Sequence, residues 1–156
     1  MKIRDFFVYL LSIIHGFRCF PLYLLWKMRL FLKDDGAVKF LEDLHMAKHC
    51  FFLTMFLKPQ YKMLLYARLG YISYPLKCIC GTFPITIDSK YNMPLGKGFE
   101  MEHPHGSHIH AKSIGDYLSI KHNVTIGVNH NELPIIGNHV SISVGACILG
   151  GGNYWR

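Results

Sequence analysis

The chain has 156 residues, of which 51% are hydrophobic and 17% charged, so an intrinsically disordered protein is excluded and one or two small domains are expected. Its net charge of +7 fits an anionic ligand such as a phosphate, or an acidic membrane surface. No run of Lys and Arg is interleaved with aromatic residues, so we expect no nucleic-acid partner. The five cysteines include no C-x-x-C pair, which favours a reduced, cytoplasmic protein.

Residues 6–32 are strongly apolar, with the sequence FFVYLLSIIHGFRCFPLYLLWKMRLFL. The longest uncharged run, from Phe6 to Phe17, is too short to cross a bilayer, and no small-residue cleavage site of a signal peptide follows it. Because proline removes a helical hydrogen bond, we predict two short helices broken near Pro21. They form either a buried cap or a peripheral contact with the inner face of the membrane, with a true span as the third alternative.

Three further helices are expected in roughly the first 70 residues. Asp35 can cap the first of them. The apolar face of that helix is expected on Val38, Leu41 and Leu44. The second helix covers about residues 47–57, and the third begins with Pro59 in its first turn and ends at Gly70. Residues 71–84 have the composition of a connector.

A six-residue period governs the second half of the chain. It separates Ile114, Ile120 and Ile126, and after an interruption Ile136, Ile142 and Ile148; a parallel register is kept by Leu118, Val124, Val140 and Ala146. Six fits neither the helical period nor strand alternation, and it is typical of a parallel β-helix built from hexapeptide repeats, chance spacing being the alternative. We therefore predict an α + β protein, with a helical N-terminal domain and connector at residues 1–75 and a hexapeptide-repeat β-helix at residues 76–156.

Four histidines follow the first predicted strand: His103, His105, His108 and His110. Alternate residues of a strand share a face, but no cysteine or carboxylate stands at a familiar ligand spacing, so we expect no metal. Catalysis suits His103 better, since Pro and Gly follow it and place it at an exposed corner. Asp88, 15 residues earlier, is expected beside it on the preceding coil, where a carboxylate would orient the imidazole. Spacing alone leaves open that His103 is only a polar corner residue.

The stretch from about Ile85 to Gly150 resembles the serine acetyltransferase group of hexapeptide-repeat acyltransferases, most closely the type associated with polysaccharide synthesis. The segments that carry the resemblance are LGKGFEMEHPHG, IHAKSIGDYLSIKHNVTIG and PIIGNHVSISVGACILGG. It implies a left-handed β-helix, acetyl-CoA as the acetyl donor, and a homotrimer with active sites between neighbouring β-helices. It also implies that His103 is the catalytic base, that Asp88 orients it, and that Glu102 binds substrate in place of an aspartate.

Two features depart from the serine-specific pattern. Where those enzymes have an Arg-His pair before the loop proline, this chain has Glu132-Leu133, which removes a cation suited to a substrate carboxylate. We therefore expect an O-acetyltransferase that acts on a hydroxyl of L-serine or of a glycan. The family also continues past Gly150 with coils that form much of the acetyl-CoA groove, so a shortened member is expected. The alternative function is a non-catalytic trimeric scaffold of the same family.

Overall fold

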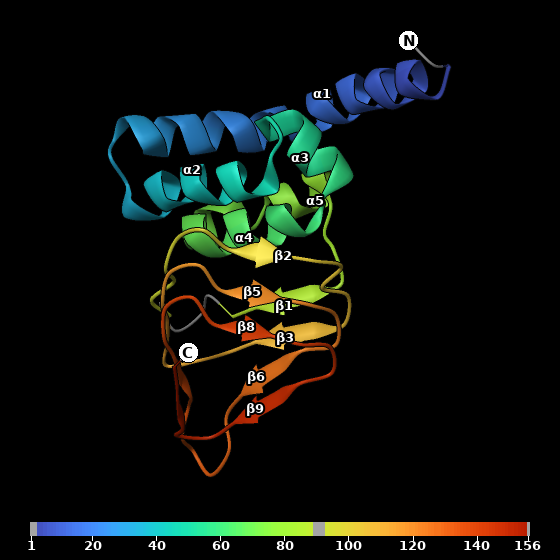
Figure 1. Ribbon diagram of the computed structural model, residues 1–156. Coiled ribbons are helices and arrows are strands. Elements are labelled where there is room, and N and C mark those ends of the chain that lie inside the picture. Colours follow the sequence, from blue (N-terminus) through green and yellow to red (C-terminus); the bar gives the residue numbers. More distant parts are fainter. Residues whose placement is uncertain (1–2, 89–92, 156) are drawn as a thin grey trace.

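The computed structural model describes residues 3–88 and 93–155 and stacks two parts on each other. Helices form one end of the molecule, and three-sided coils of short strands form the other (Figure 1). The N-terminal helix α1 lies at the end remote from the last coil and projects beyond the rest of the helical part (Figure 1). The helical part is thus a cap on one end of the coils.

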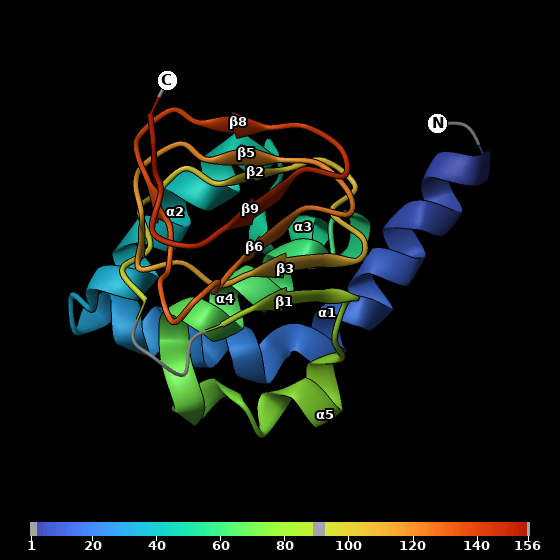
Figure 2. The same cartoon turned by 90° about the horizontal axis from the view of Figure 1, so that it is seen from below.

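Helix α1 (Ile3–Phe31) is continuous, so the prediction of two short helices broken near Pro21 is wrong. Helix α1 packs against α2, α3 and α5 and buries Cys19, Leu22 and Trp26 around the proline. This packing outweighs the cost of about 3 kcal/mol for a proline inside a helix. Figure 2 shows α1 changing direction part-way along, as helices with an internal proline do. The helical segment Phe6–Phe31 is long and apolar enough to cross a bilayer, judged by length and composition alone. Its longest uncharged run, Phe6 to Phe17, is too short to do so.

The remaining helices are α2 (Asp35–Ala47), α3 (Phe51–Leu57), α4 (Gln60–Leu69), the 3-10 helix η1 (Gly70–Ser73) and α5 (Leu76–Cys80). The three helices expected before residue 70 are therefore present, and Gly70 ends α4 with a φ of 67°. The expected connector is partly helical, since it contains η1 and α5. The helical part thus runs to Cys80, beyond the expected boundary at residue 75.

The N-cap of helix α2 lies one residue before the predicted cap, Asp35, which is the first residue of the helix. Asp34 is the N-cap, and its carboxylate accepts a hydrogen bond of 3.1 Å from the amide of Ala37. The buried face carries Ala37, Phe40, Asp43 and Ala47. Val38 and Leu41 are consequently exposed, so the apolar face predicted for this helix is wrong at these two positions, whereas Leu44 packs against the core as predicted.

The strands form three parallel sheets, each of which is one side of the β-helix. The first holds β1 (Ile85–Ile87), β3 (Ser107–Ile109), β6 (Thr125–Gly127) and β9 (Cys147–Leu149). The second holds β4 (Ser113–Ile114), β7 (Ile135–Ile136) and β10 (Asn153–Tyr154), and the third holds β2 (Glu100–Met101), β5 (Ser119–Ile120) and β8 (Ser141–Ile142). The chain visits the three sides in turn, which confirms the predicted parallel β-helix.

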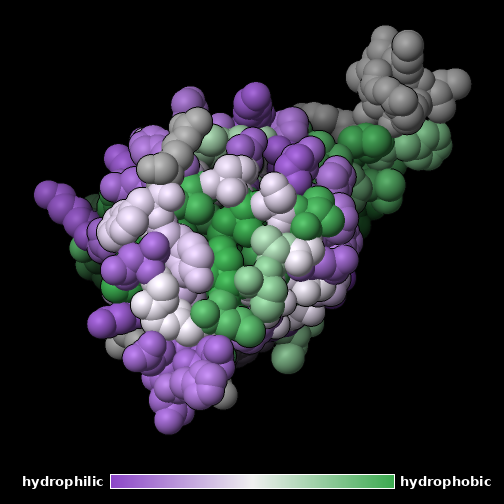
Figure 3. All heavy atoms as spheres, turned by 60° about the horizontal axis from the view of Figure 1, so that its bottom comes forward, coloured by the Kyte–Doolittle hydropathy of each residue, from purple (hydrophilic) through white to green (hydrophobic). Residues whose placement is uncertain are grey.

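The aliphatic residues of the six-residue period point into the β-helix and stack from coil to coil. The pairings place Ile109 against Ile126 and Ile126 against Ile148, all three on one side. Ile114, Ile120, Ile126, Ile136 and Ile142 are all buried. Seen from the last coil, hydrophobic side chains gather at the centre of this end and polar ones surround them (Figure 3). The interruption of the period is a loop closed by the bridge between Asn129 and Glu132.

One corner of the β-helix is a column of glycines. Gly96, Gly115 and Gly137 lie on successive coils, and a Cβ on either of the first two would collide with the backbone of the next glycine in the column. A Cβ on Gly137 would collide with the ring of Trp155. Successive coils are therefore in direct backbone contact at this corner.

Helix α4 closes the first coil. The hydroxyl of Tyr61 donates to the carbonyl of Phe99 at 3.1 Å, and the amide of Gln60 donates to the carbonyl of Met101, also at 3.1 Å. Both acceptors adjoin or lie in β2, so the helices satisfy part of the strand edge that would otherwise be open. The same contacts hold the junction of α3 and α4 against the corner that follows β2.

Candidate active site

His103 lies at the corner between β2 and β3, with its side chain exposed as predicted. Its φ of 49° is in the left-handed region, which fits a sharp corner. Met101 pairs with Ile120 and His108 with Thr125, so six residues make this corner where four make the equivalent corner of the next coil. The two additional residues enlarge the corner around His103.

A cavity of about 440 Å³ opens between this corner and the junction of α3 and α4. The β-helix contributes His103 and the carboxylates of Glu100 and Glu102, and the helices contribute Lys58 and Tyr61. The cavity therefore combines an imidazole with groups of both charges. This arrangement can bind a polar molecule and take a proton from it.

Glu102 is the acidic neighbour of His103 and has a cation of its own. Its Oε2 lies 3.2 Å from Nζ of Lys121, which occupies the matching position of the next coil. Both side chains are well exposed, so the pair is screened by water. Glu102 thus remains able to accept a hydrogen bond from a substrate bound in the cavity.

Asp88 is not beside His103 within one chain. The pairing of β1 with β3 places it level with His110, and its Oδ2 lies 3.9 Å from Nδ1 of His110. Ile85 pairs with Ser107, so this coil takes 22 residues instead of about three hexads, and an offset of 15 falls short of a full turn. Asp88 consequently follows the end of the side formed by β1 and β3, whereas His103 precedes its beginning.

The helical wall of the cavity was not predicted from the sequence. Lys58 and Tyr61 reach the site only because α4 packs on the first coil, and no local motif signals that packing. Burial, and then the charge of Asp43, raise the pKa of Tyr61 above its ordinary value. Tyr61 is therefore a neutral hydrogen-bond donor that holds the wall in place.

The other histidines of the cluster do not build a metal site in the part of the chain that the structure describes. No group of three or more His, Cys, Asp or Glu side chains could hold an ion there. The ring of His105 packs against Phe83, with centroids 4.6 Å apart, and His108 is exposed on β3. Only His103 and His105 of the cluster line the cavity.

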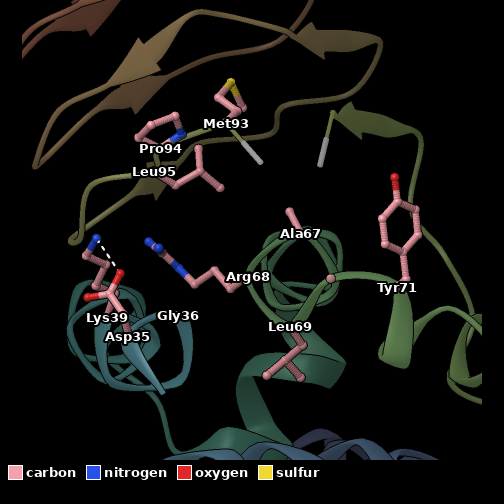
Figure 4. A pocket seen from close by; sticks show the side chains of 11 residues that line it. Asp35, Gly36, Lys39, Ala67, Arg68, Leu69, Tyr71, Met93, Pro94 and Leu95 are labelled. Carbon is pink, nitrogen blue, oxygen red and sulfur yellow. Dashed lines mark ion pairs between the residues drawn. The ribbon is translucent and has the colours of Figure 1, made fainter. Parts of the chain in front are cut away.

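A second cavity, of about 400 Å³, lies between α2, the end of α4 and residues 93–95 (Figure 4). Its cations already have partners: Nζ of Lys39 is 2.7 Å from Oδ2 of Asp35, and Arg68 is held by Asp43. Figure 4 shows Lys39 and Arg68 on the same side of this hollow. It offers no imidazole, so it is less suited to proton transfer than the cavity at His103.

Comparison with solved structures finds serine acetyltransferases. The enzyme of Neisseria gonorrhoeae is 19% identical, with a TM-score of 0.63 over 85% of this chain and 58% of its own. That of Brucella abortus strain S19 is 19% identical, with a TM-score of 0.58 over 81% and 59%. Serine acetyltransferase isoform 3 of Entamoeba histolytica, solved in complex with cysteine, is 19% identical, with a TM-score of 0.57 over 76% of this chain and 50% of its own.

The fold is that of the serine acetyltransferases. The predicted fold class, helices followed by a left-handed parallel β-helix, is therefore confirmed. The chain spans 50–59% of the length of these serine acetyltransferases. Its sequence matches no family model and no curated protein.

Proposed function

We propose that this protein is an acetyl-CoA-dependent O-acetyltransferase with His103 as its general base. The observation that carries the proposal is an exposed imidazole in a cavity of about 440 Å³, on the fold of the serine acetyltransferases. His103 takes the proton of an acceptor hydroxyl, and the oxygen attacks the thioester carbonyl of acetyl-CoA. The C–S bond then breaks, and the CoA thiolate receives the proton from His103.

Asp88 is proposed to orient His103 across a subunit interface of a homotrimer. The two residues lie at opposite ends of one side of the β-helix. In a cyclic trimer the contact is heterologous, so one patch of a protomer meets a different patch of its neighbour. Asp88 of one protomer can then stand against His103 of the next, where its carboxylate would hold one tautomer of the imidazole.

The acceptor is proposed to be L-serine or a glycan hydroxyl, the latter as in the polysaccharide-associated type. Glu100 and Glu102 in the cavity accept hydrogen bonds from sugar hydroxyls, and either can also meet an ammonium group. Glu132, where the serine-specific pattern has a cation, favours an acceptor without a carboxylate. The two classes are separated by supplying each as the acceptor.

The test follows the loss of the acetyl-CoA thioester by its ultraviolet absorbance, with L-serine or simple sugars as the acceptor. This readout avoids thiol reagents, which would label the exposed Cys50, Cys78 and Cys147. We expect turnover with one acceptor class and a loss of about 100-fold or more in His103→Ala. The matched control is His122→Ala, at the equivalent corner of the next coil, which should keep the activity. Equal silence of folded wild type and His103→Ala would favour the alternative, a non-catalytic trimeric scaffold.

A further inference from the structure

Helix α1 is apolar on two opposite faces, of which the protein covers only one. The inner face holds the buried Cys19, Leu22 and Trp26. The outer face presents large apolar side chains at helical spacings of three and four: Phe17, Phe20, Leu24, Met28 and Phe31. Phe17 is 79% and Phe31 86% exposed. A continuous exposed apolar stripe of this length marks a surface that binds a partner.

The apolar surface continues beyond this stripe. Large exposed apolar residues extend toward the N-terminus: Phe6, Phe7, Leu10, Leu11, Ile13 and Ile14. Figure 3 shows hydrophobic side chains where α1 projects from the body. Between α1 and α3 an apolar hollow of about 390 Å³ is lined by Phe17, Phe20 and Phe52, among others. The hollow has the chemistry of a site for a hydrocarbon chain.

From Phe6 onward, the charged residues of helix α1 are all cations. No carboxylate occurs from Phe6 to Lys33, whereas Arg18, Lys27 and Arg29 lie in the same segment. At about 100° per residue, Lys27 borders the apolar stripe, and the two arginines lie on the other side of the helix, nearer to its inner face. An apolar stripe on a helix whose charged residues are cations is the pattern of a helix that lies in a membrane interface.

These cations remain able to contact phosphates. The guanidinium of Arg18 donates to the carbonyl of Ile79, and that of Arg29 lies 3.2 Å from the carboxylate of Asp34. Each guanidinium has five donors, so one partner does not exhaust it. The ammonium of Lys27 lies over the ring of Trp26, 5.1 Å from its centroid, and is itself exposed.

We propose that the outer face of α1 docks on an anionic lipid bilayer, with the helix lying in the interface. A span would surround α1 with lipid and separate Cys19, Leu22 and Trp26 from the core of the protein. A second copy of this chain would set the Arg18, Lys27 and Arg29 side chains of two α1 helices beside one another. Acidic headgroups match the cations, and acyl chains match the apolar stripe. The proposal does not depend on catalysis.

The first experiment is co-sedimentation of the detergent-free protein with vesicles, either of phosphatidylcholine alone or of equal parts phosphatidylcholine and phosphatidylglycerol. We expect binding to the second kind and little to the first. Leu24→Ser should weaken binding at least tenfold, because it removes an apolar side chain that is exposed on the free protein and would be buried in the lipid. Lys27→Gln should weaken it about fivefold. The matched controls, Val144→Ser and Lys112→Gln, change exposed residues of the β-helix and should bind like wild type.

The second experiment places a fluorophore on the outer face. The native Trp26 is buried on the inner face of α1 and Trp155 lies next to β10 on the last coil, so Phe17→Trp adds a reporter on the outer face of α1, and the wild type gives the background of the two native tryptophans. Brominated lipids with bromine near the headgroup should quench it more than those with bromine deep in the chains. Circular dichroism and thermal unfolding confirm that every variant is folded.

Five results would overturn the proposal. Absence of binding to either kind of vesicle removes it, as does equal binding to both. Binding that Leu24→Ser leaves unchanged shows that another surface contacts the lipid. Quenching strongest at the bilayer centre indicates a span, and a soluble oligomer that Leu24→Ser dissociates in the absence of vesicle binding assigns the face to a second copy.

Discussion

Asp43 and Arg68 join the helices to the first coil of the β-helix. Nε of Arg68 lies 2.6 Å from Oδ2 of Asp43, and Oδ1 of Asp43 also accepts from the amide of Phe99 at 2.9 Å. Arg68 donates in turn to the carbonyl of Gly96 at 2.6 Å. Burial raises the pKa of the Asp43 carboxyl, and the adjacent guanidinium opposes that change. The pair thus links α2, α4 and the coil in one buried network.

Asp43→Asn is expected to lower the free energy of unfolding by about 3–5 kcal/mol, because it leaves the buried guanidinium of Arg68 without its counter-ion. Urea unfolding followed by circular dichroism measures the change. The matched control is Asp35→Asn, which breaks the exposed pair with Lys39 and should alter stability by no more than about 1 kcal/mol. Similar values for the two variants would show that the junction does not depend on the buried pair.

Among single residues, corners were easier to predict from the sequence than distances. The Pro and Gly that follow His103 indicate a corner, and the structure places an exposed imidazole there. The position of Asp88 could not be predicted in the same way, because it depends on how many residues the first coil contains. That coil has 22 residues, of which residues 89–92 lie outside the described part of the chain.

At the scale of elements, the local sequence pattern predicts well that a strand or helix forms. It predicts poorly which face of that element is buried and where the element is interrupted. The six-residue period depends on stacking alone, so its aliphatic positions are buried as expected up to the last coils, where three are only partly buried: Val140, Ala146 and Ile148. Helix α1 depends on tertiary contacts, and those contacts keep it continuous through Pro21. The buried face of α2 was misjudged because Ala37, a small residue, packs inward while Val38 stays exposed.

Ile126→Ala is expected to cost about 2–5 kcal/mol of unfolding free energy, because it opens a cavity in a stack that continues on both sides. Ile126 is fully buried between Ile109 and Ile148. Val144→Ala, at a position 49% exposed, serves as the control and should change stability by less than about 0.5 kcal/mol. Chemical unfolding of both variants checks the difference. A loss below about 1 kcal/mol at Ile126 would mean that the coils do not depend on continuous stacking.

At the scale of the whole molecule, the composition and the six-residue period of the sequence predict a helical part followed by a β-helix. The cavity at His103 is not, because Lys58 and Glu102 come from different parts and meet only through the packing of α4 on β2. Contacts of this kind join distant segments of the chain. A local motif carries no information about them.

Mixed oligomers test whether His103 and Asp88 act across an interface. His103→Ala and Asp88→Asn are each expected to be nearly inactive alone. In a cyclic trimer built from both, one interface keeps an intact His103 opposite an intact Asp88, so about one third of the wild-type activity should return. Co-expression with two different tags isolates the mixed species, and light scattering checks for a mass three times the 18.0 kDa of the chain.

Two outcomes contradict that arrangement. Mixed oligomers no more active than the separate variants would show that Asp88 does not act on His103 across an interface, and a monomeric mass would exclude the trimer. Full activity of Asp88→Asn alone would remove Asp88 from the reaction. The control replaces the His103→Ala chain with a His122→Ala chain. Oligomers of His122→Ala alone should already be active, so their activity does not depend on mixing with the Asp88→Asn chain.

The glycine column has a consequence for how this sequence can vary. Gly96, Gly115 and Gly137 hold neighbouring coils in backbone contact, so each fixes the pitch for the next. In a library of random substitutions, these positions should reject alanine as firmly as tryptophan, whereas exposed corners accept both. Insertions should be tolerated only at corners away from the column, as at residues 102–107 and 128–134. New specificities can therefore arise beside His103 without disturbing the repeat that supports it.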